Sequence, residues 1–304
     1  MESSQIEDSI SNSLAKLLVT PSDFPNREVV IVDDQNSLER SRRGITGESL
    51  LALDCEGIHL GRLGKISLIQ VATPSCCYLF DILHQERNCE AVVFLKTLLE
   101  DETIVKIIHD CRADSDALYH LLGIELRCVH DTQSWQMELD STPLRLNLND
   151  TLEKFGCRQN SARRKDVYKE HPSFWATRPL TDEMVRWASE DVATLFPLRE
   201  RQVQAAAAAG DDRSAARACA AASQRHADEL RSAAVGTVRI HPTQVGHFVG
   251  KGGGRVRELE RAARAVFLRA DGGAYAVYAL GGGDAAVAAA VEACRPYTVP
   301  YAKR

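Results

Sequence analysis

Short apolar runs alternate with amphipathic segments along the first two thirds of the chain. Runs that are typical of strands lie at 28–32, 50–54, 67–72, 77–81 and 104–109. The three runs between 50 and 81 are separated by short turns containing Gly or Pro, which indicates consecutive antiparallel strands. The later alternation of strand and helix favours parallel strands. We therefore expect an α/β domain, with a mixed sheet and helices on its faces.

A strongly amphipathic helix is predicted at 180–198, LTDEMVRWASEDVATLFPL. At the helical repeat of 3.6 residues, one face collects Met184, Trp187, Ala188, Asp191, Val192 and Leu195. An acidic side chain on the inward face of a helix is costly unless it has a partner. Asp191 is therefore expected either to pair with an arginine or to bind a cation.

The hydrophobic pattern divides the chain into four parts. Residues 1–24 form a polar N-terminal segment, and 25–201 carry the strand and helix pattern described above. Residues 202–234 are rich in Ala with Arg, Asp and Glu, which predicts one or two solvated helices serving as a linker. Residues 235–304 form a second domain with the order strand, short helix, Gly-rich loop, helix, strand, strand and helix.

Composition places the chain among soluble globular proteins, since 44% of its residues are apolar and 26% are charged. No run approaches the roughly 18 apolar residues of a membrane helix. The first residues are polar, unlike a signal peptide. The nine cysteines are scattered, odd in number and without a C-x-x-C pair, as expected for reduced thiols. We expect an intracellular protein, cytoplasmic or nuclear, that does not contact membranes.

The charge is distributed unevenly between the two predicted domains. Residues 231–304 hold eleven Lys and Arg against five Asp and Glu, a net of +6, whereas the rest of the chain has a net of −11. A basic C-terminal part on an acidic body predicts contact with a polyanion through that part.

Two carboxylates end the buried run LLALDCEGI, and they raise the question of what neutralises them. Asp54 and Glu56 are two residues apart, so on a strand both side chains point to the same side. Like charges held that close are unfavourable unless protons or a cation neutralise them. Either the strand has already ended and both acids are solvated, or they form part of a site that holds a cation.

Three motifs in order support the cation site. "DCE" at 54–56, "HDCRAD" at 109–114 and "WASEDVATL" at 187–195 resemble the DEDD superfamily of 3′–5′ exonucleases, in its ribonuclease D branch. The resemblance covers residues 28–201. Within that branch, "DCEGIHLGRLGKISLIQVAT" and "FWATRPLTDEMVRWASEDV" look most like Egalitarian-like proteins.

The resemblance implies an RNase H-like sheet carrying four carboxylate ligands, namely Asp54, Glu56, Asp114 and Asp191. They would hold two Mg²⁺ or Mn²⁺ ions, which prefer oxygen ligands. Such a pair supports in-line displacement at phosphorus. The implied substrate is single-stranded RNA, with DNA as a second candidate.

The chain departs from this family pattern at Trp187. The resemblance implies a tyrosine four residues before the last Asp, where it orients the attacking water, but indole offers one N–H donor and no acceptor. Residue 186, where a sister branch keeps its histidine, is Arg. One interpretation is a slower nuclease in which the metals carry most of the catalysis, with Tyr168 or His171 as candidate substitutes. The other is an RNA-binding adaptor, and the four retained acids favour the nuclease.

Neighbouring polar residues are expected to have structural roles. His59 and His109 are set aside as hydrogen-bonded residues rather than metal ligands. Asp131 is predicted to be a helix N-cap. Asp110 and Asp116 are predicted to be surface residues or caps.

The loop in "HFVGKGGGRVRELERAA" lacks the G-K-[ST] of a nucleotide-binding P-loop, which argues against an NTPase. The order βααββα around this loop instead resembles a small α+β type I KH domain over 235–296. That resemblance implies that the loop clamps single-stranded nucleic acid. The implied contacts are Gly250, Lys251, Gly252, Gly253 and Arg255. A KH-like domain that binds only protein is the alternative.

Overall fold

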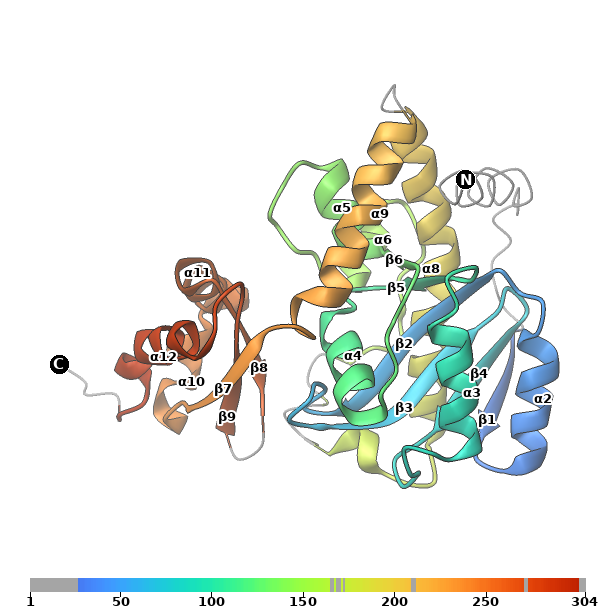
Figure 1. Cartoon of the computed structure of the whole chain (residues 1–304), viewed down its shortest axis with the longest axis horizontal. Helices are drawn as coiled ribbons and strands as arrows, with labels where there is room; N and C mark the ends of the chain where they lie inside the picture. The colour runs from blue at the N-terminus through green and yellow to red at the C-terminus, as the bar shows by residue number, and fades with distance from the viewer. Residues whose placement is uncertain are drawn as a thin grey trace.

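The computed structural model describes residues 27–164, 167, 171, 173–208, 212–270 and 273–300. The predicted polar segment 1–24 lies outside these residues. The described chain contains a six-stranded mixed sheet with flanking helices and a separate three-stranded sheet (Figure 1). The mixed α/β architecture predicted from the sequence is confirmed.

The large sheet has the strand order β1-β4-β3-β2-β5-β6. Its strands are β1 (Glu28–Val32), β2 (Leu50–Ile58), β3 (Lys65–Ala72), β4 (Cys76–Asp81), β5 (Val105–Ile108) and β6 (Val129–Asp131). Strands β2, β3 and β4 pair antiparallel, as predicted from their short turns. Strands β5 and β6 run parallel to β2, in agreement with the later strand and helix alternation.

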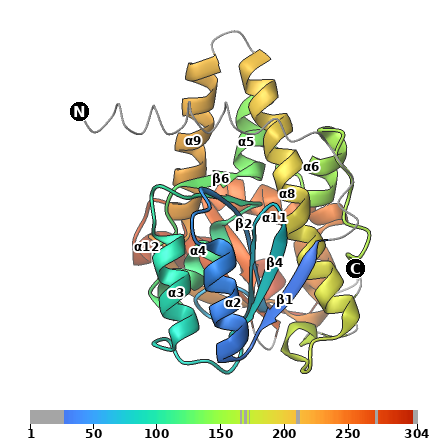
Figure 2. The same cartoon turned by 90° about the vertical axis from the view of Figure 1, so that its right-hand side faces the viewer.

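Helices cover both faces of this sheet. Helices α2 (Gln35–Ile45) and α3 (Glu90–Leu99) lie on one face, and α8 (Asp182–Ala208) lies on the other (Figure 2). Because side chains alternate along a strand, Leu51 and Leu53 of β2 join the core under α2 and α3, while Leu50 and Ala52 join the core under α8. The even-numbered acids of β2 therefore face α8.

Shorter helices connect the later strands. Helix α4 (Arg112–Ala117) follows β5 and continues into a π-helical turn, η1 (Leu118–Leu122), which ends at Gly123 with φ 70°. After β6 come α5 (Thr132–Leu139) and α6 (Leu148–Lys154), and a 3₁₀ turn, η2 (Phe174–Ala176), precedes α8.

The Ala-rich stretch is helical, but it is not a solvated linker. Helix α8 extends to Ala208, and α9 (Asp212–Glu229) returns alongside it and packs on β6, α4 and α5 (Figure 1). Cys219, Ala222 and Ala227 of α9 are buried. The Ser115 hydroxyl donates to the Ala227 carbonyl over 2.6 Å. This half of the predicted linker is part of the wall of the first domain.

The C-terminal part follows the predicted order of elements. It comprises β7 (Ala234–Arg239), η3 (Pro242–Gln244), α10 (Val245–Val249), η4 (Lys251–Gly253), α11 (Gly254–Ala263), β8 (Ala265–Arg269), β9 (Ala274–Ala279), α12 (Asp284–Ala293) and η6 (Arg295–Tyr297). The sheet order is β7-β9-β8, all antiparallel. Val249, Val256 and Leu259 pack against its core, as their spacing predicts.

The two parts are joined by a buried polar contact. Asp116 of α4 has a fully buried side chain, which corrects the prediction that it is a surface residue or cap. It accepts hydrogen bonds from the Arg62 backbone N–H (2.6 Å) and from the Tyr278 hydroxyl of β9 (2.9 Å). Arg62 also donates to the carbonyl of Arg231, just after α9. Burying a charge requires such partners, so the first domain is built to receive the C-terminal sheet.

Among the described residues, none of the helices has the length and apolarity required to cross a membrane.

Candidate functional site

Strand β2 carries the first two acids at the point where its pairing with β5 ends. The β2–β5 ladder stops at Ala52, and a register shift follows Glu56 on the β3 side. Asp54 is half-buried and Glu56 is 8% exposed. The acids are therefore not solvated residues beyond the strand, which excludes the first of the two interpretations of the D-x-E pattern.

Asp114 lies beside the part of β2 that extends beyond its pairing with β5. The chain turns after β5 at Asp110, with φ 55°, and enters α4 so that the Asp114 side chain faces β2. Its Oδ1 accepts a hydrogen bond from the backbone N–H of Cys55, between the two strand acids, over 3.1 Å. The third predicted acid thus lies against the backbone that carries the first two.

Asp191 is supplied from α8 and is held by three donors. Its Oδ1 accepts from the Asn160 side chain over 2.8 Å, and its Oδ2 accepts from the Trp187 indole N–H over 2.9 Å. The Arg163 Nε lies 3.3 Å from the same Oδ2. The arginine expected for Asp191 is therefore Arg163, and two further carboxylates, those of Asp54 and Glu56, also lie close by.

Three of the four predicted acids form one cluster of possible ligand atoms. Carboxylate oxygens of Asp54, Glu56 and Asp191 lie within 4.8 Å of one another. The Asp114 carboxylate is not in this group, and one of its oxygens accepts from the Cys55 N–H. It is still close enough for the charge of Asp54 to raise its pKa.

Burial and mutual repulsion make these acids weak in the absence of a cation. Burial, followed by the charge of Asp191, raises the pKa of Asp54 to about 7. Burial, followed by the charge of Asp54, raises the pKa of Glu56 well above its usual value. Burial also raises the pKa of Asp191, although Arg163, Asn160 and Trp187 each lower it. The cluster therefore favours any positive charge that enters it.

A buried amide supports the fit of this site to a cation. Gln70 of β3 lies directly opposite Asp54 in the ladder and is fully buried, and its side-chain oxygen and nitrogen have no hydrogen-bond partner among the described residues. Orphaned polar atoms are rare in native interiors. An oxygen-rich site with an uncommitted amide beside it matches the ligands that Mg²⁺ and Mn²⁺ take.

Trp187 is not available to a water molecule. Its indole is 2% exposed, packs on Phe174 and Trp175, and gives its N–H to Asp191. His171, one of the suggested substitutes, has an exposed side chain, unlike the buried acids. Tyr168, the other, lies outside the described residues. His109 is hydrogen-bonded to Thr132 (2.8 Å) and to the Leu146 carbonyl, which confirms its structural role.

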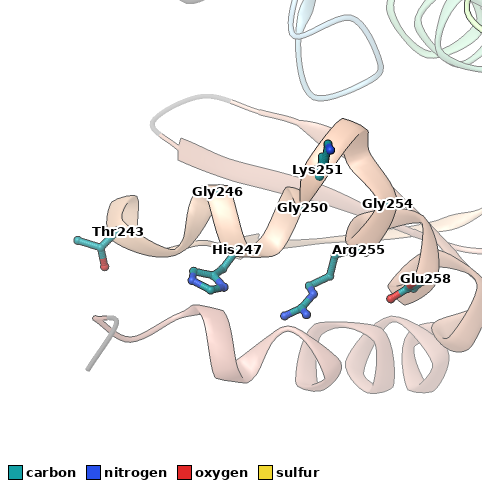
Figure 3. A pocket seen from close by; sticks show the side chains of 8 residues that line it. All are labelled: Thr243, Gly246, His247, Gly250, Lys251, Gly254, Arg255 and Glu258. Carbon is teal, nitrogen blue, oxygen red and sulfur yellow. The ribbon is translucent and has the colours of Figure 1, made fainter. Parts of the chain in front are cut away.

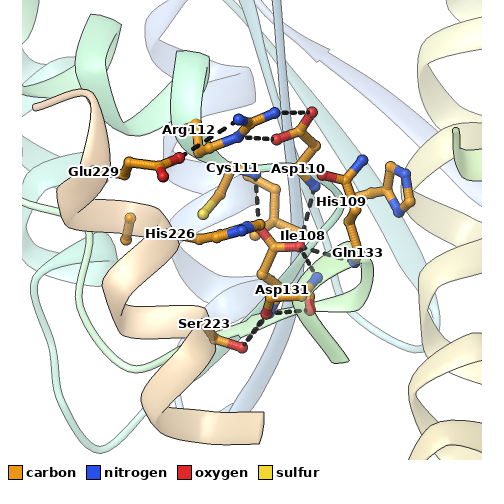
Figure 4. Close-up of polar contacts among 12 residues, drawn as sticks. Ile108, His109, Asp110, Cys111, Arg112, Asp131, Gln133, Ser223, His226 and Glu229 are labelled. Atoms are coloured by element: carbon orange, nitrogen blue, oxygen red, sulfur yellow. Dashed lines mark hydrogen bonds and ion pairs between the residues drawn. The ribbon is translucent and has the colours of Figure 1, made fainter. Parts of the chain in front are cut away.

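A second polar network holds the loop that precedes Asp114 (Figure 4). Asp131 is the N-cap of α5, as predicted, and accepts from the N–H groups of Gln133 (2.8 Å) and Ser134 (3.1 Å). It also accepts from Cys111 N–H (2.8 Å), while His226 of α9 lies 3.4 Å away. Burial opposes its ionisation, yet the interactions with His226 and Cys111 keep the pKa of Asp131 well below its usual range.

Asp110 lies in the same network and pairs with Arg112, with Nη2 and Oδ2 2.9 Å apart. Its backbone N–H donates to Asp131. It thus ties the start of α4 to the end of β6.

Several contacts of the site were not foreseen from the sequence. Gln70 and Asn160 carry no motif of their own. The one signal for Gln70 is a polar residue inside the otherwise apolar run SLIQVA. Arg163 is one of several arginines in its loop, and nothing in the sequence singles it out.

The Gly-rich loop lies beside a hollow in the C-terminal part (Figure 3). A pocket of about 460 Å³ is lined by Thr243, Gly246, His247, Gly250, Lys251, Gly254, Arg255 and Glu258. Gly250, Gly252 and Gly253 all have positive φ, between 56° and 76°, which a residue with a Cβ rarely adopts. A Cβ on Gly250 would also lie 2.9 Å from the Arg255 nitrogen. The glycines are therefore required by the path of the backbone around this pocket.

Comparison with known proteins identifies the family of the first domain. A family model described as 3′–5′ exonuclease matches residues 29–202. The chain is similar to the piRNA biogenesis protein EXD1 of Mus musculus, with 32% identity over 203 residues, 62% of this chain and 35% of that protein. It is also similar to the Egalitarian protein homolog of Caenorhabditis elegans, with 30% identity over 152 residues, 45% of this chain and 25% of that protein. The chain thus spans about a third of the mouse protein and a quarter of the worm protein.

Solved structures of RNase D share the fold of the first domain. Trypanosoma brucei RNase D superposes with a TM-score of 0.58 and 25% identity, over 67% of this chain and 74% of that chain. The same enzyme in complex with RNA U12 has a TM-score of 0.56 at 25% identity, over 66% and 71% of the two chains. Escherichia coli RNase D, at 21% identity, shares the fold with a TM-score of 0.53, over 66% of this chain and 51% of that one.

Proposed function

The chain belongs to the 3′–5′ exonuclease family, and from this membership we propose that it removes nucleotides from the 3′ end of single-stranded RNA, with DNA as a second candidate substrate. The observation that carries the proposal is the convergence of Asp54, Glu56 and Asp191, from two distant segments, within 4.8 Å. A domain that only binds RNA gains nothing from buried acids that repel one another and the phosphates of its ligand.

In this proposal, Asp54, Glu56, Asp114 and Asp191 hold two Mg²⁺ or Mn²⁺ ions. When bound, such ions activate a water molecule and stabilise the leaving 3′ oxygen. Trp187 and Asn160 are positioning residues, because their N–H groups fix both oxygens of Asp191. The buried cluster of Phe174, Trp175 and Trp187 keeps water from that side of Asp191.

We assign the C-terminal part to the type I KH class and propose that it captures the same strand. The order of its elements and the glycine loop support this assignment. Gly250 and Gly254 line the pocket, where a sugar–phosphate chain could approach their backbone, and Lys251 and Arg255 line it as cations. In Figure 3 the side chains of His247, Arg255 and Glu258 follow one another along it. This domain would raise the concentration of 3′ ends near the acids.

A second candidate function is that of an RNA-binding adaptor without useful catalysis. Two observations favour it, namely that the Trp187 N–H is already used by Asp191 and that Arg163 supplies a positive charge inside the acidic site. Losing a proton-handling group typically costs about 10²–10⁴-fold in rate. The adaptor would keep RNA affinity with no metal-dependent turnover.

The test is degradation of a 5′-labelled single-stranded RNA with Mn²⁺ or Mg²⁺. We expect progressive shortening from the 3′ end that stops with EDTA, and no cleavage of the same RNA in circular form. Asp54→Asn should reduce the rate at least about 100-fold, whereas Asp33→Asn, an exposed acid of the same domain, should not. A single-stranded DNA of the same sequence compares the two substrates. No shortening by the wild type or by Trp187→Tyr would leave the adaptor as the function.

A further inference from the structure

A groove lies where the C-terminal part meets the first domain, and the acidic site does not include it. Its volume is about 640 Å³. The first domain contributes the loop 143–145, between α5 and α6, together with Glu229 at the end of α9. The C-terminal part contributes α11 and the start of β8. In Figure 1 the loop that leaves α5 reaches toward α11.

Four arginines line this groove, from both walls. Arg145 comes from the first domain, and Arg257, Arg261 and Arg264 come from the C-terminal part. We call these four residues the arginine groove. No ion pair among the described residues involves any of them. Arg145 is half-buried, and burial, with the charge of Arg112, lowers its pKa.

The acids near the groove balance these charges only in part: Asp110, Glu229 and Glu260 act on Arg145, the arginine of the first domain, and oppose the lowering of its pKa. Glu229 is 3.4 Å from Arg112, outside the four. Glu260 accepts a hydrogen bond from the Phe267 N–H over 3.1 Å, and burial raises its pKa. Among the described residues, Glu258 is the one acid lining the groove whose side chain forms neither an ion pair nor a hydrogen bond. Arg257, Arg261 and Arg264 form no ion pair among the described residues, so the wall of the C-terminal part presents positive charge to the groove, which suits a polyanion.

The groove adjoins the pocket at the Gly-rich loop, and its other wall is hydrogen-bonded to the loop that precedes Asp114. Gly254 and Glu258 line both this groove and the pocket at the Gly-rich loop. At its other wall, Arg145 precedes Leu146, whose carbonyl lies 3.1 Å from the His109 ring in the loop that leads to Asp114. The exposed side chain of Leu144, at 53%, adds an apolar surface for bases. One strand that contacts the Gly-rich loop and the acids would cross this groove.

We propose that the arginine groove binds the sugar–phosphate backbone of single-stranded nucleic acid between the Gly-rich loop and the acidic cluster. This inference rests on the proposed function, since it assigns the path of the same strand. It predicts that the chain distinguishes long strands from short ones. A trinucleotide is long enough for the Gly-rich loop or the acidic site alone, and without metal only the loop attracts it, whereas a strand of about 12 nucleotides also occupies the groove.

The experiment measures binding of 5′-fluorescein oligouridylates of 3 and 12 nucleotides by anisotropy, in EDTA, with the full chain. Arg257→Glu with Arg261→Glu, both exposed on α11, should weaken 12-mer binding at least 10-fold and leave the trinucleotide unchanged. The slope of log K against log salt should become shallower by about 0.7 for each phosphate that the variant no longer neutralises. Arg145→Gln, on the opposite wall, should act in the same direction.

Arg43→Glu with Arg295→Glu is the matched control, because both residues are exposed, the charge change is equal, and neither lines the groove. It should change 12-mer affinity less than twofold. Equal 12-mer affinities for the groove and control variants would overturn the inference, even if the wild type degrades RNA. If the groove variants weaken 12-mer binding but the wild type degrades no RNA, the inference about the groove holds and the proposed nuclease activity is wrong. If the variant Arg257→Glu with Arg261→Glu also loses trinucleotide binding, it is misfolded. The 12-mer affinity of Arg145→Gln then tests the inference.

Discussion

Asp191 and its partners explain what the Trp187 substitution does. A tyrosine at this position offers both a donor and an acceptor, whereas the indole has one N–H and gives it to Asp191 Oδ2. The side chain therefore fixes a carboxylate instead of a water molecule. Arg163 adds a second effect, because its charge partly offsets the repulsion among the acids and competes with an incoming cation.

The raised pKa values predict how stability depends on pH without metal. Asp54 has a folded pKa of about 7, against about 3.9 in an unfolded chain. The folded state therefore binds more protons between these values, and the free energy of unfolding falls as pH rises through this window. Asp54→Asn removes the effect, so its Tm should exceed that of the wild type by a few degrees at pH 8, with a smaller gain at pH 5, by calorimetry in EDTA.

Asp101→Asn provides a control of opposite sign. Hydrogen bonds from Thr103 lower the pKa of Asp101, so its carboxylate stabilises the fold above its unfolded pKa. Its loss should lower Tm at pH 7 and matter less as the pH falls. A Tm difference between Asp54→Asn and wild type that is constant from pH 5 to 8 would contradict the account of the acidic cluster.

At the scale of elements, helix α9 holds the loop that precedes Asp114 and leads into α4. His226 and Ser223 of α9 contact Asp131, whose carboxylate also receives backbone N–H groups of that loop (Figure 4). Removing a hydrogen bond to a buried charge costs about 1.5 kcal/mol. His226→Ala should therefore lower Tm by several degrees, measured by thermal unfolding. Arg225→Ala, one residue away but exposed and paired among the described residues with Glu138 alone, should stay within about 0.5 kcal/mol of wild type.

The strands and the long amphipathic helix could be predicted because each carries its own period. The run at 28–32 coincides with β1, and Asp191 lies on the buried face that its spacing indicates. Packing of α9 could not be predicted in this way. Its buried face consists of Cys219, Ala222, Ser223 and Ala227, which are small or polar, so no apolar stripe marks it.

The candidate site likewise contains some residues that the sequence identifies and others that it does not. The four acids belong to motifs that can be recognised in order along the chain. Asn160 and Gln70 act through contacts with residues 31 and 16 positions away, respectively, and such contacts leave no local pattern. The prediction for Asp116 is wrong for the same reason, since its partner Tyr278 is 162 residues distant.

At the scale of the whole molecule, the contact between Asp116 and Tyr278 joins the C-terminal sheet to the first domain. The C-terminal sheet is held on the first domain by the Tyr278 hydroxyl and by Arg62, whose guanidinium lies 5.3 Å from the Tyr278 ring. Tyr278→Phe leaves a buried carboxylate with one donor fewer, at a cost of about 1.5–3 kcal/mol. We expect the C-terminal part to unfold at a lower temperature than the first domain, seen as a separate calorimetric transition. Tyr275→Phe, three residues earlier on the same strand and packed in the other core, should leave a single transition.

The central claim is that the acids of β2, α4 and α8 bind a pair of divalent cations. Crystals grown with Mn²⁺, with data collected at the manganese absorption edge, test it most directly. We predict two anomalous peaks about 3.5–4 Å apart, bounded by Asp54, Glu56, Asp114 and Asp191, with the Arg163 side chain moved away from Asp191. An acidic cluster without manganese, with Arg163 still against Asp191 at millimolar Mn²⁺, would contradict the claim.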